Sequence, residues 1–427
     1  MTPERISPAA LQPLQLSRAW RRGRIVPLAA PVPQEQEALA AAIGPAGLEP
    51  LERRWGPGVV LGSGGSRGGG GAGRRWCLLP LSHLQASAAA TGRWLEEQGL
   101  DPAACLHLNP LPLHHVSGLL PWLRARQWGG RHRRLERAWM RQPALLATAA
   151  PLPKERPVLL SLVPTQLQRL MAEPAAAAWL RRLALIWVGG APLSAELAGR
   201  ARAVGLRLAP CYGATETAAM VTALPPQRFL DGAVGCGPPL PGVELRCRDR
   251  SGAVELRSAR LSPGWLEAGE LHSLPLDPDG WWRSGDAGLL TAAGLELLGR
   301  LDGAIHSGGE TVFPEQLEQR LMAAAAAARL PLQAVLLLAE HDREWGQRLV
   351  ALVRPTGGAD GAALLARLEQ LCAGWAAAER PRRWLLCPDL APSPLGKWQR
   401  GRWRRRLQAL EAGHADATSR ADEHLQR

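Results

Sequence analysis

Short apolar runs alternate with amphipathic segments of helical length through the first half of this 427-residue chain, and this alternation limits the folds that it can adopt. Two of the runs are Val158–Val163 and Leu183–Val188, and helical segments follow them at 165–171 and 194–204. A strand that leads through a helix to the next strand favours a mainly parallel sheet with helices on both faces. We therefore predict an α/β fold for this part of the chain.

The same pattern extends toward the N-terminus. Further strands are expected at 59–61, 77–81 and 105–113, and another at 206–209. A helix is predicted over 82–99, with Ser82 as its N-cap, and a second from about Val116. Residues 1–57 are rich in Pro and Arg and weakly periodic, so we expect them to wrap around the first domain.

The pattern changes after about residue 235, where the apolar runs become shorter and are bounded by turns. Such runs are typical of antiparallel strands, here at 243–248, 253–257 and 295–298. A smaller α+β unit follows, with helices expected at 314–328 and 362–378 and strands at 334–339 and 348–354. The predicted organisation is an N-terminal domain over 1–301 with a β-rich subdomain at about 235–301, a small mobile domain over 302–410 and a disordered tail over 411–427.

The charge and the cysteines narrow the class of function. The net charge of +13 admits a polyanionic partner, but the Arg residues are spread along the chain, so we do not expect nucleic-acid binding. The 7 Cys residues show no C-x-x-C spacing, which argues against zinc or thioredoxin-like chemistry and for reduced thiols. Without a signal-peptide pattern or an apolar stretch long enough to span a bilayer, the expected location is the cytoplasm.

A glycine-rich tract from Gly62 to Gly73 follows the strand at 59–61. Glycines let backbone N–H groups turn toward a phosphate, and Ser63 and Ser66 add hydroxyl donors. The tract is not a Walker loop, because no Lys-Ser or Lys-Thr pair follows it. A flexible linker is the alternative interpretation.

The segment Tyr212-Gly213-Ala214-Thr215-Glu216 comes directly after a predicted strand, where α/β sheets bind ligands. A Tyr can stack on a purine, a Thr hydroxyl can bond a phosphate and a Glu can hold Mg²⁺. The alternative is a loop with a helix cap.

Three further segments, the first of them in two parts, carry polar groups beside glycines. Ser284-Gly285-Asp286 and Gly299-Arg300-Leu301-Asp302 supply a carboxylate and a guanidinium that could grip a ribose diol, although Gly-Asp pairs are also common in surface turns. Ser307-Gly308-Gly309-Glu310 and Gly396-Lys397 follow, and the lysine is notable because Lys is rare in this Arg-rich chain.

These five segments stand in an order that resembles the adenylate-forming superfamily of acyl–CoA synthetases, luciferases and peptide-synthetase adenylation domains. The resemblance runs from about Val59 to about Arg402. It implies an enzyme that activates a carboxylic acid with ATP and Mg²⁺ and then passes the acyl group to coenzyme A.

The resemblance also assigns roles to residues of the N-terminal domain. Tyr212 and Gly213 would face the adenine, Thr215 the α-phosphate and Glu216 the Mg²⁺. Asp286 and Arg300 would hold the ribose hydroxyls. The remaining residues form two groups: Ser63, Gly64, Gly65 and Ser66 would cover the ATP phosphates, and Gly189, Gly190, Ala191 and Pro192 would line the adenine and acyl pocket.

In the small domain, the resemblance makes Asp302 the hinge. Lys397 would bridge the acyl carboxylate and the α-phosphate during adenylation. Gly308 and Gly309 would face the pocket in the thioester-forming state, after the domain has rotated. Lys397 and Glu216, with Thr215, would then stabilise the charge that develops when two anions meet.

One departure concerns the glycine tract. The family's loop usually continues into Pro-Lys-Gly, whereas here it continues through glycines into Arg74 and Arg75. Either arginine could replace the missing lysine, but the two residue types are not geometrically equivalent.

The acid is indicated by two segments, 112–119 and 161–170, which resemble those of 2-succinylbenzoate–CoA ligases of menaquinone and phylloquinone synthesis. His115, Ser117 and Thr165 would lie near the acyl pocket, with His115 among the catalytic groups. Pro-Leu-x-His is widespread in the superfamily, however, and Thr165 could simply cap a helix.

Two other functions stay open at this point. One is a CoA ligase for another aryl or medium-chain acid. The other is a non-catalytic protein that binds adenylates or acyl-CoA, suggested by the altered loop. The sequence leaves a homo-oligomer possible.

Overall fold

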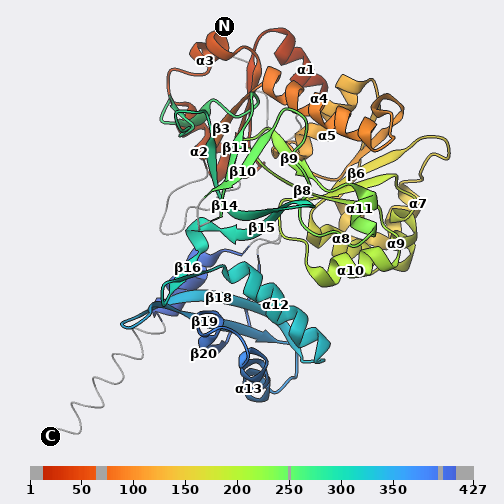
Figure 1. Cartoon of the computed structure of the whole chain (residues 1–427). Helices are drawn as coiled ribbons and strands as arrows, with labels where there is room; N and C mark the ends of the chain where they lie inside the picture. The colour runs from red at the N-terminus through yellow and green to blue at the C-terminus, as the bar shows by residue number, and fades with distance from the viewer. Residues whose placement is uncertain (1–12, 64–74, 249–251, 393–397, 410–427) are drawn as a thin grey trace, which may run out of the picture. The chain divides into compact units, whose positions relative to one another are not determined.

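The computed structural model describes residues 13–63, 75–248, 252–392 and 398–409. The described chain divides into two compact units, a larger one that ends at Leu297 and a smaller one that begins at Leu298 (Figure 1). The domain limits drawn from the sequence, with a hinge at Asp302, stay a prediction. The tail at 411–427 lies outside the described residues.

A six-stranded sheet forms the centre of the larger unit, with the strand order β5-β4-β6-β7-β8-β9. Every neighbouring pair is parallel except β8 and β9. The strands are β4 (Leu106–Asn109), β5 (Arg131–Arg134), β6 (Val158–Leu162), β7 (Leu185–Val188), β8 (Leu208–Ala214) and β9 (Ala219–Ala223). The predicted α/β class is confirmed, because the apolar runs become strands whose two faces are both covered by helices.

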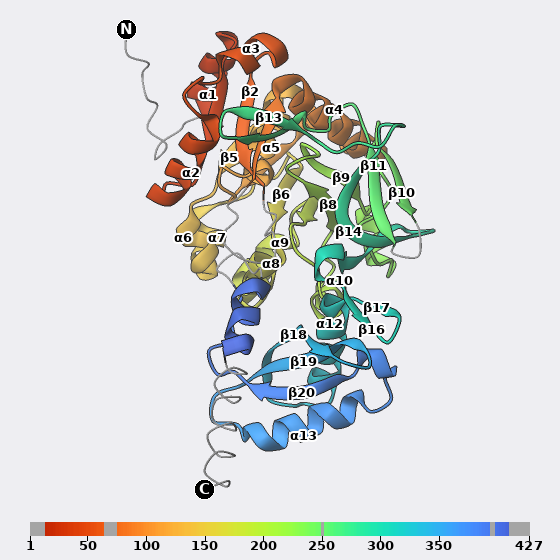
Figure 2. The same ribbon diagram turned by 90° about the vertical axis from the view of Figure 1, so that its left-hand side faces the viewer.

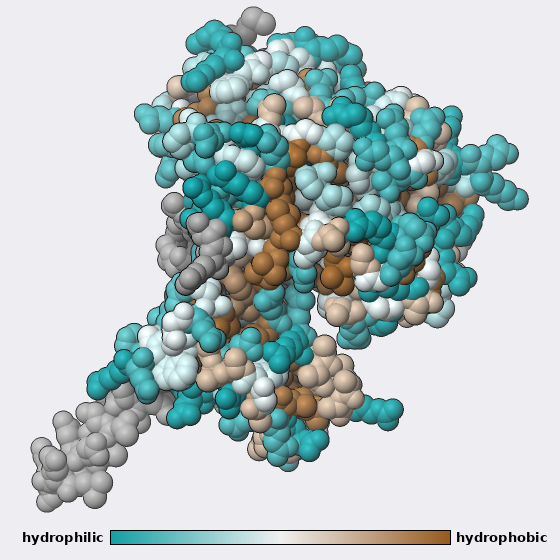
Figure 3. Space-filling model, viewed as in Figure 1, coloured by the Kyte–Doolittle hydropathy of each residue, from teal (hydrophilic) through white to brown (hydrophobic). Residues whose placement is uncertain are grey.

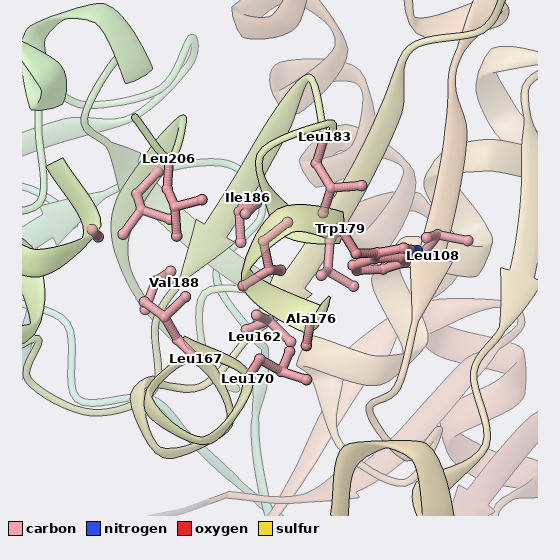
Figure 4. Packing of buried hydrophobic residues seen from close by; sticks show 14 of the residues in the cluster. Leu108, Leu162, Leu167, Leu170, Ala176, Trp179, Leu183, Ile186, Val188 and Leu206 are labelled. Atoms are coloured by element: carbon pink, nitrogen blue, oxygen red, sulfur yellow. The ribbon is translucent and has the colours of Figure 1, made fainter. Parts of the chain in front are cut away.

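The helices of the larger unit lie in layers beside this sheet. One face packs against the helices that follow β6 and β7, where Leu167, Leu170 and Trp179 meet Leu162, Ile186 and Val188 (Figure 4). Trp94 and Trp128 cover the other face. The helices are α4 (Leu81–Glu97), η2 (Pro102–Ala104), α5 (Val116–Trp128), α6 (Arg137–Arg141), α7 (Pro143–Ala149), α8 (Pro164–Met171), α9 (Pro174–Leu180), α10 (Ala195–Ala203) and α11 (Pro226–Leu230).

A second sheet lies on the far side of α4 and α5, in the order β1-β2-β3-β12-β13. Its pairs are antiparallel apart from β1 and β2. The N-terminal region, expected only to wrap the domain, supplies an edge strand and three helices to it. The elements are α1 (Pro13–Arg21), β1 (Ile25–Leu28), α2 (Pro33–Ile43), α3 (Glu49–Trp55), β2 (Gly58–Gly62), β3 (Trp76–Pro80), β12 (Gly264–Glu267) and β13 (Glu270–Ser273).

A third, four-stranded sheet is antiparallel in the pairs that are defined, as predicted for the region after 235, in the order β10-β11-β14-β15. Its strands are β10 (Glu244–Arg248), β11 (Ala253–Arg257), β14 (Trp282–Thr291) and β15 (Gly294–Arg300).

The visible face of the larger unit is mostly hydrophilic, with hydrophobic residues gathered in a narrow strip (Figure 3).

The smaller unit has its own sheet, in which β18 and β19 form a long antiparallel pair and β20 adds to β19 in parallel. Helices α12 and α13 cover one face, and a final helix over 400–409 covers the other (Figure 2). The elements are η3 (Leu301–Gly303), β16 (Ile305–Ser307), β17 (Glu310–Val312), α12 (Pro314–Ala327), β18 (Leu332–Asp342), β19 (Gly346–Pro355), α13 (Gly361–Cys372), η4 (Ala377–Glu379) and β20 (Pro381–Leu386).

The N-termini of α10 and α4 differ in their helix caps. Ser194 caps α10, because its hydroxyl accepts the backbone N–H of Leu197 at 3.2 Å. The cap predicted at Ser82 is wrong: α4 already begins at Leu81, directly after Pro80, and has no side-chain cap. Within the described ranges, each helix is too short or too polar to cross a membrane.

Candidate active site

The carboxyl ends of the parallel strands bring several predicted site residues to one edge of the six-stranded sheet. Gly189 directly follows β7, and Thr165 lies in the first turn of α8, just after β6. His115 is the residue before α5, the helix that follows β4, and Ser117 is exposed in the first turn of α5. This edge is where open α/β sheets bind ligands. Thr165 does not cap α8, since the cap position is Val163.

Backbone packing at this edge leaves no room for larger residues. A Cβ atom on Gly189 would lie 2.8 Å from Sγ and 3.0 Å from the carbonyl oxygen of Cys211. The Gly189 N–H donates to the carbonyl of Leu162 at 3.2 Å, which ties the ends of β6 and β7 together. Gly190, Ala191 and Pro192 then lead toward α10.

The Tyr212 hydroxyl donates a hydrogen bond to Oδ2 of Asp286 at 2.7 Å. Tyr212 is a buried residue on β8 and Asp286 lies on β14, so the fold joins two segments that are 74 positions apart. A Cβ atom on Gly213 would meet the Ala219 carbonyl oxygen at 2.2 Å. The Ser-Gly-Asp segment is thus part of a strand, and its interpretation as a surface turn is wrong.

Glu216 and Thr215 are both buried, with 8% and 9% exposure, in the turn after β8. Oε1 of Glu216 accepts the indole N–H of Trp265 at 2.9 Å, and its backbone carbonyl accepts the N–H of Ser262 at 2.7 Å. The turn leads into β9 and not into a helix, so the helix-cap interpretation does not hold.

The environment of Glu216 fits a divalent cation. In the described part of the chain, no Lys, Arg or His forms an ion pair with this carboxylate. A buried carboxylate is costly unless it is paired or coordinates a metal. Mg²⁺ is commonly bound through one or two carboxylates, water and substrate phosphates, so a single buried carboxylate is enough to hold it. In the described ranges, no group of three or more His, Cys, Asp or Glu is placed to hold a metal ion.

The two ends of the glycine tract meet beside this carboxylate. The Ser63 N–H donates to the carbonyl of Arg75 at 2.8 Å, and Ser63 is buried. The Arg75 guanidinium lies 4.4 Å from the centroid of the Trp265 ring. Gly64, Gly65 and Ser66 lie outside the described residues. Trp265 was missed by the sequence reasoning because it stands in a short antiparallel strand with no motif around it.

In the smaller unit, Arg300 forms a two-fold hydrogen bond with Asp302, at 3.1 Å for both Nε and Nη2. Gly308 and Gly309 form the turn between β16 and β17. Lys397 lies outside the described residues. The predicted roles of these residues stay predictions.

The Cys211 thiol lies beside Gly189 but is not a nucleophile in this environment. Burial raises the pKa of Cys211 to about 12, so the thiol is protonated near neutrality. All 7 cysteines are free, in agreement with the expected reduced state.

A hollow of about 460 Å³ lies elsewhere on the larger unit, at the β5 edge of the sheet. It is lined by Leu106, Arg131, Arg133, Pro151, Leu152, Pro153 and Arg156. None of the predicted site residues contributes to it.

Comparisons with known proteins show similarity to AMP-binding enzymes. Residues 79–270 match the AMP-binding enzyme family. The 2-succinylbenzoate–CoA ligase of Salmonella typhimurium is 34% identical over 285 residues, which cover 66% of this chain and 56% of that protein. The ligase of Enterococcus faecalis is 28% identical over 330 residues, or 74% and 63% of the two chains. The chain thus spans less than two thirds of the length of either ligase.

Solved structures give a consistent result. E. coli MenE with a bound m phenylether-linked analogue of OSB-AMS superposes with a TM-score of 0.60 and 27% identity, over 82% of this chain and 69% of that chain. Bacillus subtilis MenE in complex with the acyl-adenylate intermediate OSB-AMP gives 0.66 and 20%, over 80% and 68%. The second likeness is one of fold.

Proposed function

We propose that the chain is an AMP-binding enzyme and acts as an ATP-dependent acyl–CoA ligase through an acyl-adenylate, a proposal supported by the match of residues 79–270 to that family. The observation that carries the proposal is the pair of hydrogen bonds that bring Tyr212 to Asp286 and Glu216 to Trp265 on one side of the larger unit. Tyr212, Asp286 and Glu216 come from two of the five sequence segments, and a nucleotide needs an aromatic face, a ribose acceptor and a metal ligand close together.

The first half-reaction joins the acid carboxylate to the α-phosphorus of ATP and releases diphosphate. Glu216 would hold Mg²⁺, which supplies positive charge and Lewis acidity at the phosphates. Asp286 orients Tyr212 through its hydroxyl, so that the ring is fixed against a purine, and Asp286 would also accept a ribose hydroxyl. Thr215 would donate to the α-phosphate.

Lys397 would supply the second positive charge, between the acyl carboxylate and the α-phosphate. Two anions approach each other in this step, and an ammonium ion placed between them stabilises the transition state more than the ground state. Arg300 would complete the ribose contact.

The second half-reaction is the attack of the coenzyme A thiol on the acyl-adenylate carbonyl, with AMP as leaving group. Rotation about Asp302 would withdraw Lys397 and bring the Gly308–Gly309 turn to the pocket. His115 would lie beside the acyl group in both states.

We propose 2-succinylbenzoate as the acid, in quinone synthesis. The names of the bacterial relatives support this substrate, as does the analogue bound by the E. coli structure. His115, Ser117 and Thr165 would line the acyl pocket at the edge where β4 and β6 end. ATP, Mg²⁺ and coenzyme A complete the reaction, in the cytoplasm.

The test is a diphosphate-release assay with a panel of acids, followed by detection of the acyl-CoA by mass spectrometry. We expect release with 2-succinylbenzoate and a thioester product that depends on coenzyme A. If diphosphate is released only with other aryl or medium-chain acids, one of those acids is the substrate and 2-succinylbenzoate is not. No release with any acid, together with binding of AMP or acyl-CoA, would identify a non-catalytic binding protein instead.

A further inference from the structure

Three side chains share one face of the second sheet beside the predicted metal site. Trp265 on β12 is the direct antiparallel partner of Cys77 on β3, so the side chains of the two residues stand on the same face. Arg75 precedes Cys77 by two positions and therefore also points to this face. Trp265 and Arg75 form a diagonal pair, in agreement with the 4.4 Å between the guanidinium and the indole centroid.

Glu216 reaches the same face from a different sheet. Its carboxylate accepts the Trp265 indole N–H at 2.9 Å. The indole therefore contacts Glu216 at its N–H edge and Arg75 at its ring face.

Arg75 stands where the glycine tract ends. Its carbonyl accepts the Ser63 N–H at 2.8 Å, which fixes the Arg75 backbone, and the Trp265 ring then positions the guanidinium. A guanidinium over an indole gains about 0.5–2 kcal/mol and keeps its N–H groups free to reach a phosphate in the ring plane.

We propose that Trp265 is a positioning residue that holds the Glu216 carboxylate for Mg²⁺ and the Arg75 guanidinium for the outer phosphates of ATP. Arg75 thereby takes the place of the lysine that the glycine tract lacks. The inference rests on the proposed function, since it assumes that Glu216 holds Mg²⁺ and that ATP binds beside it.

The experiment is calorimetric titration of ATP into the full chain without acid, once with Mg²⁺ and once with a chelator. Trp265→Phe keeps the ring under Arg75 and removes the N–H donor. We expect it to weaken ATP binding roughly tenfold with Mg²⁺, as for loss of a hydrogen bond to a charged group, and to leave metal-free binding unchanged. Trp281→Phe is the matched control, because the Trp281 ring also lies under guanidinium groups, 4.0 Å from Arg246.

Arg75→Gln should weaken ATP binding with and without Mg²⁺ alike, and Arg75→Lys should restore part of the loss because the charge returns. Arg54→Gln is the control, since Arg54 stacks on Trp55 at 5.3 Å. Thermal unfolding of each variant shows whether the substitution has impaired folding. Trp265→Gln is a second variant for the same question. It retains an N–H donor for Glu216 but loses the ring beneath Arg75, so its ATP binding should be weaker with and without Mg²⁺ while it keeps more of the Mg²⁺ dependence than Trp265→Phe.

Two results would overturn the inference. One is a Trp265→Phe protein whose Mg²⁺ dependence equals that of Trp281→Phe, and the other is an Arg75→Gln protein that binds ATP like wild type. If the wild-type chain itself binds no ATP, both the proposed function and the inference are wrong. If the wild-type chain binds ATP and the Trp265 and Arg75 variants bind it equally well, only the inference is wrong.

Discussion

The two units bury arginine side chains in opposite ways. In the larger unit, Arg124 and Arg260 are 3% and 2% exposed, and among the described residues neither pairs with a carboxylate. Arg260 donates to the Met220 carbonyl at 2.9 Å, and Arg124 lies 5.5 Å from the centroid of the Trp187 ring. Burial lowers the pKa of Arg124 to about 9 and that of Arg260 to about 10.

In the smaller unit, Arg400 is matched by acids. Its Nη1 and Nη2 donate to the two oxygens of Glu318 at 2.9 and 2.8 Å, and its Nε donates to Glu315 at 3.2 Å. Glu318 also accepts the Leu337 N–H at 2.7 Å. The network fixes the final helix to α12 and β18.

The two units therefore differ in whether a buried arginine is paired with carboxylates. The larger unit leaves positive charge uncompensated inside the part of the fold that carries the predicted nucleotide residues. The smaller unit neutralises its buried cation and so holds the segment that directly follows Lys397. Loss of a guanidinium should therefore have different consequences in the two units.

The largest effect is expected for Arg400→Met. It leaves Glu318 buried without its cation, which costs about 3–5 kcal/mol in comparable pairs. The free energy of unfolding of the smaller unit, followed by urea titration with proteolysis, measures the loss. Arg320→Met is the control, because Arg320 is 50% and its partner Glu379 32% exposed, so about 0–1 kcal/mol should be lost. Equal effects of the two substitutions would contradict the comparison.

Lys397→Ala tests the chemistry assigned to the same unit. Adenylation should fall by about 10²–10³-fold, whereas thioester formation from supplied acyl-adenylate should be largely spared. The chain has only one other lysine, Lys154, which is exposed, so Lys154→Ala is a direct control. An equal loss in both half-reactions would contradict the proposed role.

The pH dependence of stability should have opposite signs in the two units. Burial lowers the pKa of His132 to about 4, so its contribution to the larger unit is lost as the pH falls from about 6.5 toward 4. Burial, opposed by Arg400, raises the pKa of Glu318 to about 7, so the stability associated with its protonation is lost as the pH rises from about 4.5 to 7.

His132→Gln and Glu318→Gln separate these contributions. The difference in unfolding free energy between wild type and each variant should change by at most about 1.4 kcal/mol per pH unit, with opposite slopes. Parallel slopes would show that the two groups are not buried as described.

The smallest effect is expected for Arg124→Met. Because an unpaired buried cation is replaced by an apolar side chain, stability should change by less than about 1 kcal/mol or increase. A urea titration gives the value. A loss as large as that of Arg400→Met would mean that Arg124 has a compensating partner after all.

Strands of the six-stranded sheet could be predicted when their sequence was apolar. β6 and β7 are buried on both faces, so the continuous runs Val158–Leu162 and Leu185–Val188 mark them clearly. β5 was missed because Arg131–Arg134 is entirely basic. It is an edge strand that pairs with β4 in the described chain, with Arg131 and Arg134 exposed and His132 and Arg133 half-buried.

The candidate site also contains residues that the sequence could predict and residues that it could not. Tyr212, Glu216 and Asp286 could be chosen from their motifs, although the hydrogen bond between Tyr212 and Asp286 depends on strand pairing that no local pattern encodes. Trp265 and Arg75 carry no motif, and their shared face follows only from the register of β12 against β3.

The Arg400–Glu318 contact joins positions 82 residues apart and has a practical consequence for recombination between relatives. A hybrid enzyme that exchanges the last helix alone would separate the guanidinium from its carboxylate, whereas a crossover placed before Pro314 would transfer both together. The C-terminal unit should therefore be inherited as one block.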